Sequence, residues 1–383
     1  MDYLLTDEQK MIQELTRKIA DEKIRPVAAK YDAKEEFPWP VIKVLAESDL
    51  FAIFVPEQYG GTGGSVLDLC IATEELSRAC GSIAVCYAAS ALGTIPIVLF
   101  GNDEQNKKYL PDLAKGKKIA AFAVTEPEAG SDASAIKTTA VKKGDHYVLN
   151  GTKHFITNGG EAETYVVIAM TDKSKGARGA SAFIVEKGTP GFTFGKKEEK
   201  LGIRSSSTRE LIFSDCKIPK ENLLAKEGMG FIVTMRTFDK SRPGVAAQAL
   251  GIAQGALDHA VKYARERVQF GKPISSFQGI QWMIADMATE VEAARALVYA
   301  VARTIDAGNG SVSKESAMAK LFASDVAMKV TTDAVQIFGG YGYMRDYPVE
   351  KYMRDAKITQ IYEGTNQIQR NIIALQIIKE LAK

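Results

Sequence analysis

The chain has few of the side chains that most often bind metals. Its 383 residues include three histidines and four cysteines, and no two cysteines form a CxxC pair. A structural zinc site needs four such ligands, so the sequence predicts no metal site. Nor do four cysteines in so long a chain resemble the dense disulfide framework of a small secreted protein, and we expect them to be buried apolar side chains. These residues are His146, His154, His259, Cys70, Cys80, Cys86 and Cys216.

Several catalytic signatures are also missing. There is no GxSxG nucleophile elbow, no GxxxxGK[ST] phosphate loop and no HExxH motif. The glycine-rich segment 60–64 does not have the GxGxxG spacing that follows a strand in nicotinamide-binding folds. These absences argue against serine hydrolysis, phosphoryl transfer and a nicotinamide cofactor.

The chain lacks an excess of either charge. Its 49 basic and 47 acidic residues leave a net charge of +2, so we expect neither nucleic acid nor an anionic membrane as a partner. The first 23 residues are amphipathic and contain both signs of charge, unlike a signal or transit peptide. We see no uninterrupted apolar run of the roughly 18 to 20 residues that a membrane span requires, and we expect a cytoplasmic protein.

What is present is enough apolar sequence for a large core, with 46% hydrophobic residues. The chain exceeds the usual size of one core, and its patterns divide it into three parts. Residues 1–119 have helical periodicity, with Thr6 and Gln9 as a capping box. Residues 120–228 contain short β-branched and aromatic runs between turn residues, which predict an antiparallel β barrel or sandwich. Residues 229–383 predict four helices of a bundle.

One carboxylate stands out as a candidate base. Glu363 lies in the mostly apolar segment 360–367, directly before a Gly-Thr turn that can start a helix. Burial would raise its pKa towards that of a useful base. The alternative is a helix-start glutamate that faces water, and spacing alone favours that alternative.

Longer motifs decide between the two readings. Two segments resemble the two signatures of the acyl-CoA dehydrogenase family, and further matches lie between them, so the resemblance covers nearly the whole chain. The signature segments are FAVTEPEAGSD at 122–132 and QIFGGYG at 336–342 with RDAKI at 354–358 and YEGT at 362–365. The intervening matches are KHFITNG at 153–159, FDKSRP at 238–243 and ERVQFG at 266–271.

The resemblance implies an α+β, three-domain enzyme with FAD as its cofactor. It implies that Phe122, Val124 and Thr125 border the flavin ring on one side and that Phe155 and Thr157 press against its other side. A tryptophan is common in the family where this chain has Phe155. Ordinary strand packing is the alternative for the first three residues.

Other matching residues extend this implied cofactor site. The group that reaches the FAD pyrophosphate and adenosine is matched here by Arg267, Gln269 and Phe270. The group that approaches from a neighbouring subunit is matched by Gln336, Ile337, Gly339 and Gly340. Thr365 and Gln367 match contacts at the start of the last helix. Because this family site is completed across subunits, the resemblance implies a homotetramer, a dimer of dimers.

The resemblance also assigns the substrate and the reaction. The implied acyl-CoA contacts, of which Ser131 also counts among the cofactor contacts, are Ser131, Phe238, Asp239, Arg242, Glu363 and Gly364. Glu363 would take the α-proton while the β-hydrogen leaves as hydride to FAD, giving a trans-2-enoyl-CoA as in fatty acid β-oxidation. Some relatives place the base at the position of Ser241, which cannot serve. The family passes its electrons to electron-transferring flavoprotein, whereas the oxidases of this fold are usually longer.

The acyl group is predicted less sharply. Small side chains in the segment 83–99 leave room, and we expect a short-to-medium chain. No arginine lies between Cys80 and Lys107, which argues against a dicarboxylate such as glutaryl-CoA. An alicyclic or branched acyl-CoA remains an alternative, as does a catalytically silent member that binds acyl-CoA. The same residues could also reduce an enoyl-CoA, given a strong electron donor.

Overall fold

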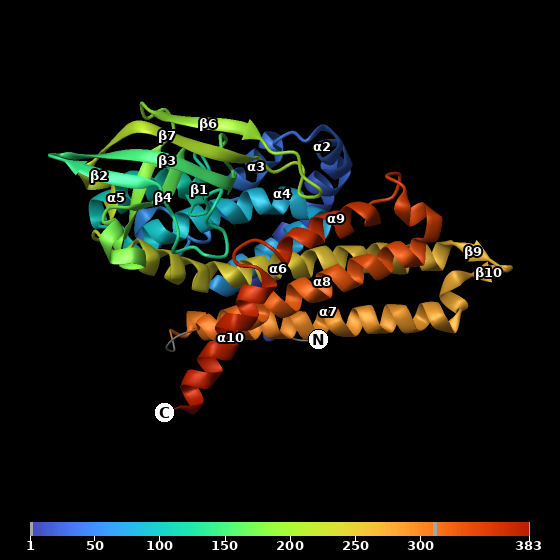
Figure 1. Cartoon of the computed structure of the whole chain (residues 1–383). Coiled ribbons are helices and arrows are strands. Elements are labelled where there is room, and N and C mark those ends of the chain that lie inside the picture. The colour runs from blue at the N-terminus through green and yellow to red at the C-terminus, as the bar shows by residue number, and fades with distance from the viewer. Residues whose placement is uncertain (1–2, 309–311, 383) are drawn as a thin grey trace.

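The computed structural model describes residues 3–308 and 312–382. Figure 1 shows a helical N-terminal third, a β-sheet at one end, and long helices that run from beneath the sheet to the opposite end. This order confirms the predicted helical, β, helical architecture. The exact domain boundaries stay predictions, although the first strand begins at Ala120 and the first long C-terminal helix begins at Gly230.

The N-terminal part is helical, and its first helix begins as the sequence predicts. The Thr6 side chain accepts a hydrogen bond from the Gln9 N–H while the Gln9 side chain accepts one from the Thr6 N–H, so the capping box is confirmed. The helices of this part are α1 (Asp7–Ile19), α2 (Ala28–Lys34), α3 (Trp39–Glu47), α4 (Val66–Phe100) and α5 (Asp103–Ala114).

The helix α4 is the central element of this part. By length and composition it could cross a membrane, so the expectation that no segment is apolar enough was wrong for this helix. However, 72% of its most apolar window is buried inside the protein, which accounts for its composition without a membrane. Cys80, with φ −164° and ψ 107°, interrupts the helical backbone and divides α4 into two segments.

The sheet lies against α4 (Figure 1). Its strands are ordered β6-β7-β3-β2-β4-β5-β8, and β1 pairs with β4 beside this path. The pairings are antiparallel except β1 with β4 and one β2–β4 contact, which are parallel, so the predicted antiparallel pattern is incomplete. The strands are β1 (Ala120–Ala123), β2 (Thr139–Lys143), β3 (His146–Thr157), β4 (Thr164–Met170), β5 (Ala180–Glu186), β6 (Phe192–Lys197), β7 (Thr208–Pro219) and β8 (Leu223–Leu224).

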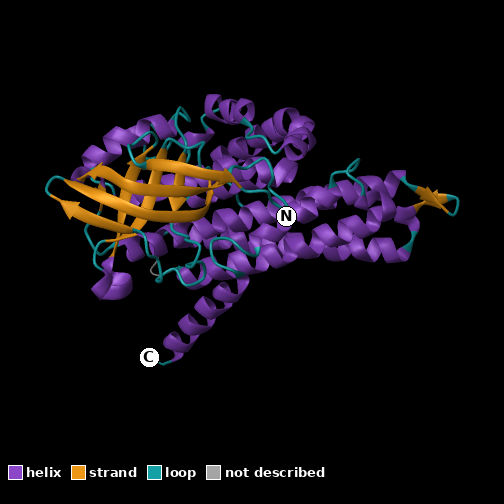
Figure 2. Cartoon of the chain, turned by 45° about the horizontal axis from the view of Figure 1, so that its top comes forward, coloured by secondary structure: helices purple, strands orange, loops and turns teal. Residues whose placement is uncertain are grey.

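Within residues 229–308 and 312–382 the structure has one more α-helix than the four predicted, together with a short β-ribbon. Its helices are α6 (Gly230–Glu266), α7 (Gln278–Asp306), α8 (Ser313–Phe338), α9 (Val349–Thr359) and α10 (Asn366–Leu381). The additional helix is α9, and the ribbon between α6 and α7 consists of β9 (Val268–Gln269) and β10 (Lys272–Pro273). Figures 1 and 2 show α10 leaving the other helices and ending away from the body of the protein.

Two close approaches position the elements that form the site. A Cβ atom on Gly93 of α4 would lie 2.5 Å from the Ala121 nitrogen of β1, so only glycine lets this strand lie so close to the helix. A Cβ atom on Gly251 of α6 would lie 2.2 Å from the Glu74 carbonyl oxygen of α4. The strand β1 and the helix α6 therefore both border α4, and the cavity that contains Glu363, called the main cavity below, lies where the three meet.

Candidate active site

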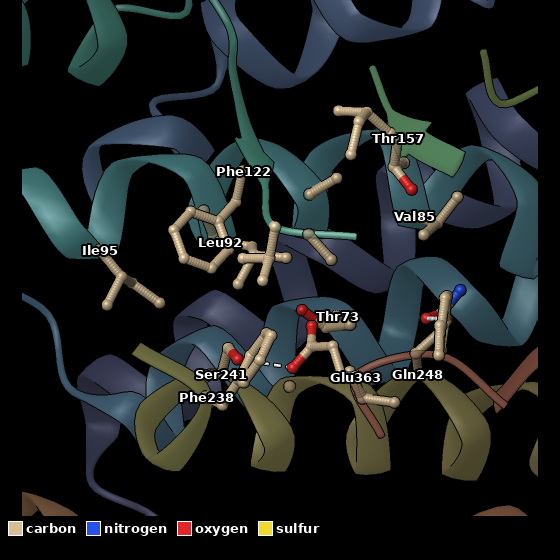
Figure 3. A pocket seen from close by; sticks show the side chains of 18 of the residues that line it. Thr73, Val85, Leu92, Ile95, Phe122, Thr157, Phe238, Ser241, Gln248 and Glu363 are labelled. Atoms are coloured by element: carbon tan, nitrogen blue, oxygen red, sulfur yellow. Dashed lines mark hydrogen bonds between the residues drawn. The ribbon is translucent and has the colours of Figure 1, made fainter. Parts of the chain in front are cut away.

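The main cavity brings together residues that the sequence predicted at distant positions. Its walls come from α4, β1, β3, α6 and the loop between α9 and α10. Figure 3 shows Glu363 in the middle, with Val85 and Gln248 on one side and Phe238, Ser241 and Ile95 on the other. The predicted site residues that line this cavity are Phe122, Val124, Thr125, Phe155, Thr157, Phe238 and Glu363.

The Glu363 side chain points into the cavity from a strained backbone. Its φ is +49°, in the left-handed region that non-glycine residues seldom adopt, and Gly364 follows at +92°. Burial raises the pKa of Glu363, while a hydrogen bond from Ser241 and the charges of Arg242 and Lys320 oppose that rise. The carboxyl group is therefore a stronger base than an exposed glutamate.

Ser241 is a functional side chain whose part the sequence did not show. Its hydroxyl on α6 donates a hydrogen bond of 2.6 Å to Oε2 of Glu363 (Figure 3). The sequence indicated only that Ser241 cannot replace the base. Its spacing to Ala249 and Ile252 on the buried face of α6 was the available signal, because a serine there must point into the protein.

The wall formed by β1 and β3 combines apolar surface with fixed polar groups. Phe122 and Val124 are buried, whereas the Phe155 ring is 60% exposed and its φ is +58°. The buried Lys153 ammonium of β3 donates to the Val124 carbonyl at 2.9 Å and to the Glu126 carboxylate at 2.7 Å. Lys153 thus ties the segment after β1 to β3 and fixes both sides of this wall.

A second hollow lies at the far end of α6. There the Arg267 guanidinium lies over the Tyr341 ring, 5.3 Å from its centroid. Phe270 beside it is 92% exposed, and Gln336 is exposed as well. The predicted cofactor residues that line this hollow are Arg267, Gln269, Ile337, Gly339 and Gly340.

The two hollows are far apart within one chain. Ser241 borders the first and α6 ends at Glu266 beside the second, and the intervening 25 residues at 1.5 Å per residue span about 37 Å. The structure therefore places Arg267 with Gly339 and Gly340, and not with Glu363. The resemblance had assigned only Gln336, Ile337, Gly339 and Gly340 to a neighbouring subunit, whereas in the structure Arg267 lies together with Ile337, Gly339 and Gly340.

The remaining predicted contacts lie outside the main cavity. Ser131 is exposed in the loop after β1, and Gln367 is exposed on the first turn of α10. Thr365 caps α10, its hydroxyl accepting from the Ile368 N–H at 3.3 Å. Their roles towards FAD and acyl-CoA stay predictions.

Two predicted substrate contacts are buried. Arg242 is 4% exposed and Asp239 is 8% exposed, and their charged groups lie 3.7 Å apart. The Arg242 Nε also donates to the Glu363 carbonyl at 3.4 Å. The observed contacts of this arginine support the base, and a direct contact to the nucleotide stays a prediction.

Comparison with known proteins identifies the family. Three family descriptions match in order: the acyl-CoA dehydrogenase N-terminal domain at residues 6–117, the middle domain at 121–216 and the C-terminal domain at 228–378. The chain belongs to the acyl-CoA dehydrogenase family. It is thus an oxidoreductase that acts on acyl-CoA.

Individual relatives match over almost their full length. The short-chain specific acyl-CoA dehydrogenase of Clostridium acetobutylicum is 51% identical over 380 residues, which cover 99% of this chain and 100% of that protein. The structure of butyryl-CoA dehydrogenase from Megasphaera elsdenii superposes with a TM-score of 0.96 at 49% identity, covering 99% of this chain and 100% of that one.

Two further structures bear on the cofactor and the electron partner. A chain from a study of the electron transferring flavoprotein of Acidaminococcus fermentans and flavin-based electron bifurcation has a TM-score of 0.96 and 54% identity, covering 98% of this chain and 99% of that one. An acyl-CoA dehydrogenase from Bacillus anthracis in complex with FAD has a TM-score of 0.93 and 37% identity, covering 99% of this chain and 68% of that one.

The cofactor of this acyl-CoA dehydrogenase is FAD, and the residues present fit it. The cavity offers the exposed Phe155 ring to a planar group, and the Thr125 and Thr157 hydroxyls and the β1 backbone to a polar ring edge. The second hollow offers the Arg267 guanidinium, which suits a diphosphate.

Replacing the base with its neutral isostere should stabilise the protein. Because the folded state raises the pKa of Glu363, the protonated form is favoured there, and stability is lost as pH rises through that pKa. Glu363→Gln should therefore melt at a higher temperature than wild type at pH 7 to 8. The difference should shrink towards pH 4, below the usual pKa of a free glutamate of about 4.3. Thermal unfolding across this pH range measures it, with the exposed Glu22→Gln as a control that should change nothing.

Proposed function

We propose that this acyl-CoA dehydrogenase oxidises a short-chain acyl-CoA to its trans-2-enoyl-CoA, with Glu363 as the base that takes the α-proton. The single observation that supports this most is the Glu363 carboxylate in the middle of the cavity, raised in pKa and oriented by Ser241. Bound FAD accepts the β-hydrogen as hydride in such chemistry.

The chain supplies both acidification and deprotonation of the α-carbon. Among the described residues nothing accepts a hydrogen bond from the Glu363 N–H, which leaves this donor for the thioester carbonyl. Polarising that carbonyl makes the α-proton more acidic. The carboxylate of the same residue then takes the proton, and an acyl chain in the cavity removes water from around it and strengthens it as a base.

A short acyl chain is supported by the closed end of the cavity. Gln248 is 1% exposed; its Nε2 donates to the Gly81 carbonyl at 3.0 Å, and its Oε1 accepts from the Tyr362 hydroxyl. This bonded pair closes the cavity on the Val85 side of Glu363 (Figure 3). No lysine or arginine lines the cavity among the described residues, so a second carboxylate on the acyl group would find no cation. These features support a short substrate without a second carboxylate.

Loss of the base should abolish reduction of the flavin. Anaerobic addition of butyryl-CoA should bleach the flavin of the wild type rapidly, and Glu363→Gln should slow bleaching by about 10³-fold or more, because general-base catalysis is worth that order. Stopped-flow absorbance at the flavin band measures both. Bleaching that persists at the wild-type rate in Glu363→Gln would contradict the assignment.

Opening the closed end should lengthen the preferred substrate. Gln248→Ala removes side-chain volume where a longer chain would extend, enough for about two of the four additional methylenes of octanoyl-CoA. At about 0.8 kcal/mol per buried methylene, kcat/KM for octanoyl-CoA relative to butyryl-CoA should rise about tenfold. Tyr362→Phe is the matched control, because the ring still fills the end and the ratio should stay near that of wild type. An unchanged ratio in Gln248→Ala would show that another residue limits the chain.

We also propose a homotetramer, a dimer of dimers, in which a neighbouring chain completes each FAD site. The distance of about 37 Å between the two hollows supports this, because one chain cannot bring Arg267 to its own Glu363 cavity. The apolar side chains exposed on α10 support burial against another copy. These are Leu375, Ile377, Ile378 and Leu381.

Two inactive variants should therefore restore each other. Arg267→Ala should lose FAD, and Glu363→Gln should lose the base, yet tetramers of the two co-expressed chains should be active at about a quarter of their sites. Each such site takes its base from the first chain and its arginine from the second. Light scattering should give four times the chain mass of 41.6 kDa. No recovery on co-expression would contradict a shared site.

The electron acceptor we propose is electron-transferring flavoprotein, supported by the likeness to the chain from the Acidaminococcus fermentans study. The reduced enzyme from the bleaching experiment should be reoxidised faster by that protein than by dissolved oxygen.

We also propose that the enzyme is cytoplasmic. Its four free, buried cysteines support this proposal, since unpaired thiols suit a reducing compartment.

A further inference from the structure

The backbone of the base is held by side chains that take no part in the cavity itself. Glu363 and Gly364 both have positive φ, and a conformation of this kind persists only where the surroundings fix it. Their two carbonyl oxygens point away from the cavity into the contact between α6, α8 and α10. There each carbonyl accepts hydrogen bonds from buried side chains.

Three helices supply these donors. Gln369 of α10 donates through Nε2 to the Glu363 carbonyl at 3.1 Å and to the Gly364 carbonyl at 2.9 Å. Lys320 of α8 donates through Nζ to the Gly364 carbonyl at 2.8 Å. Arg242 of α6 donates to the Glu363 carbonyl at 3.4 Å. The peptide groups of the base are thus held at both carbonyls.

Lys320 is the unusual member of this set. Its side chain is fully buried on a face of α8 that otherwise carries only neutral side chains among the described residues. Its ammonium bonds to two neutral oxygens, those of the Gly364 carbonyl and the Asn366 side chain, each at 2.8 Å. Among the described residues it has no carboxylate within ion-pair distance. A buried cation without a direct anionic partner is costly, so its position calls for a functional reason.

We propose that Lys320 is a positioning residue for the base: its ammonium fixes the Gly364 carbonyl, and its positive charge favours the carboxylate form of Glu363. This inference rests on the proposed function of Glu363. Neither Lys320 nor Gln369 lines the cavity, so neither is expected to touch substrate or cofactor.

The charges around Lys320 are consistent with an electrostatic interaction between Lys320 and Glu363. Burial lowers the pKa of Lys320 to about 7; Glu363 and Asp325 act to raise it, and Arg242 acts to lower it further. Asp325 lies on the same helix and is paired with Arg370 of α10 at 3.0 Å. The helices α7 and α9 place no charged group that interacts with Lys320 among the described residues. The positive charge of Lys320 in turn lowers the pKa of Glu363.

The test removes the charge and keeps a hydrogen-bond donor. In Lys320→Gln, the pKa of Glu363 should rise, so the acid limb of the pH profile for flavin bleaching by butyryl-CoA should move to higher pH by about half a unit. The rate at pH 6 should fall about threefold more than the rate at pH 8. An acid limb that stays at the wild-type position, whatever the rate, would overturn the proposal.

Two control variants distinguish the loss of the Lys320 charge from general damage to the active site. Lys329→Gln changes an exposed lysine of the same helix, paired with Glu290, and should leave the profile unchanged. Gln369→Met removes carbonyl donors without altering charge, so it should lower the rate equally at all pH values and leave the limb in place. A limb that moves in Gln369→Met as far as in Lys320→Gln would overturn the part assigned to charge.

A further variant covers the case in which Lys320→Gln yields no flavin-loaded protein. Asn366→Asp places a carboxylate beside the Lys320 ammonium and cancels its charge. The acid limb of the pH profile should again move to higher pH. An acid limb that stays in place would overturn the proposal. If Glu363→Gln itself still bleaches, the base assignment fails. If Glu363→Gln is inactive and the limb does not move in the Lys320 variant, only this inference fails.

Discussion

The close packing of α4 on α6 is the contact on which the rest of the site depends. The backbones approach so closely at Gly251 that any side chain would overlap the Glu74 carbonyl, and the Ile252 side chain of α6 packs directly against Gly81 of α4. Because the middle of each helix is buried, including residues 241–253 of α6, this contact excludes water where the two helices cross. It also fixes Ser241 and Gln248 of α6 opposite the small side chains of α4. The cavity is therefore a space left between two rigid helices and not a mobile loop.

Polar groups buried around this frame determine the local geometry. Lys153 joins the segment after β1 to β3 through the Val124 carbonyl and Glu126. On α9, Lys351 donates to Asp355 of the same helix, and the other oxygen of Asp355 joins α9 to the segment between β6 and β7 by accepting from the Ile203 N–H at 2.6 Å. A buried ammonium has few allowed positions, since each of its donors must find an oxygen. Such residues define one arrangement of the chain where apolar packing alone would permit several.

The sequence alone predicted the structure correctly where local pattern and burial agree. The capping box of α1, the long helices α6 and α8 and the apolar strands all follow periodicity, and motif resemblance located Glu363. The structure differs where polar residues are buried or strands are exposed. The strand β2 is short and ends in two exposed lysines, so no apolar run marks it. The helix α9 was missed because Lys351 and Asp355, which look like a solvated face, are paired inside the protein. Ser241, Lys320 and Gln369 meet Glu363 only through tertiary packing, which spacing cannot show.

The basicity of Glu363 follows from two opposed effects of the same packing. Burial between α4 and α6 disfavours the charged carboxylate, whereas the Ser241 hydroxyl and the positive charges of Arg242 and Lys320 favour it. Burial alone would raise the pKa of the group further, and the donors and cations alone would make it a weaker base. Since the donors and cations belong to helices while the acyl group enters from the cavity side, substrate can desolvate the carboxylate without displacing the groups that stabilise it. The separation of these two faces lets the residue become more basic on binding while the groups that favour its carboxylate form stay in place.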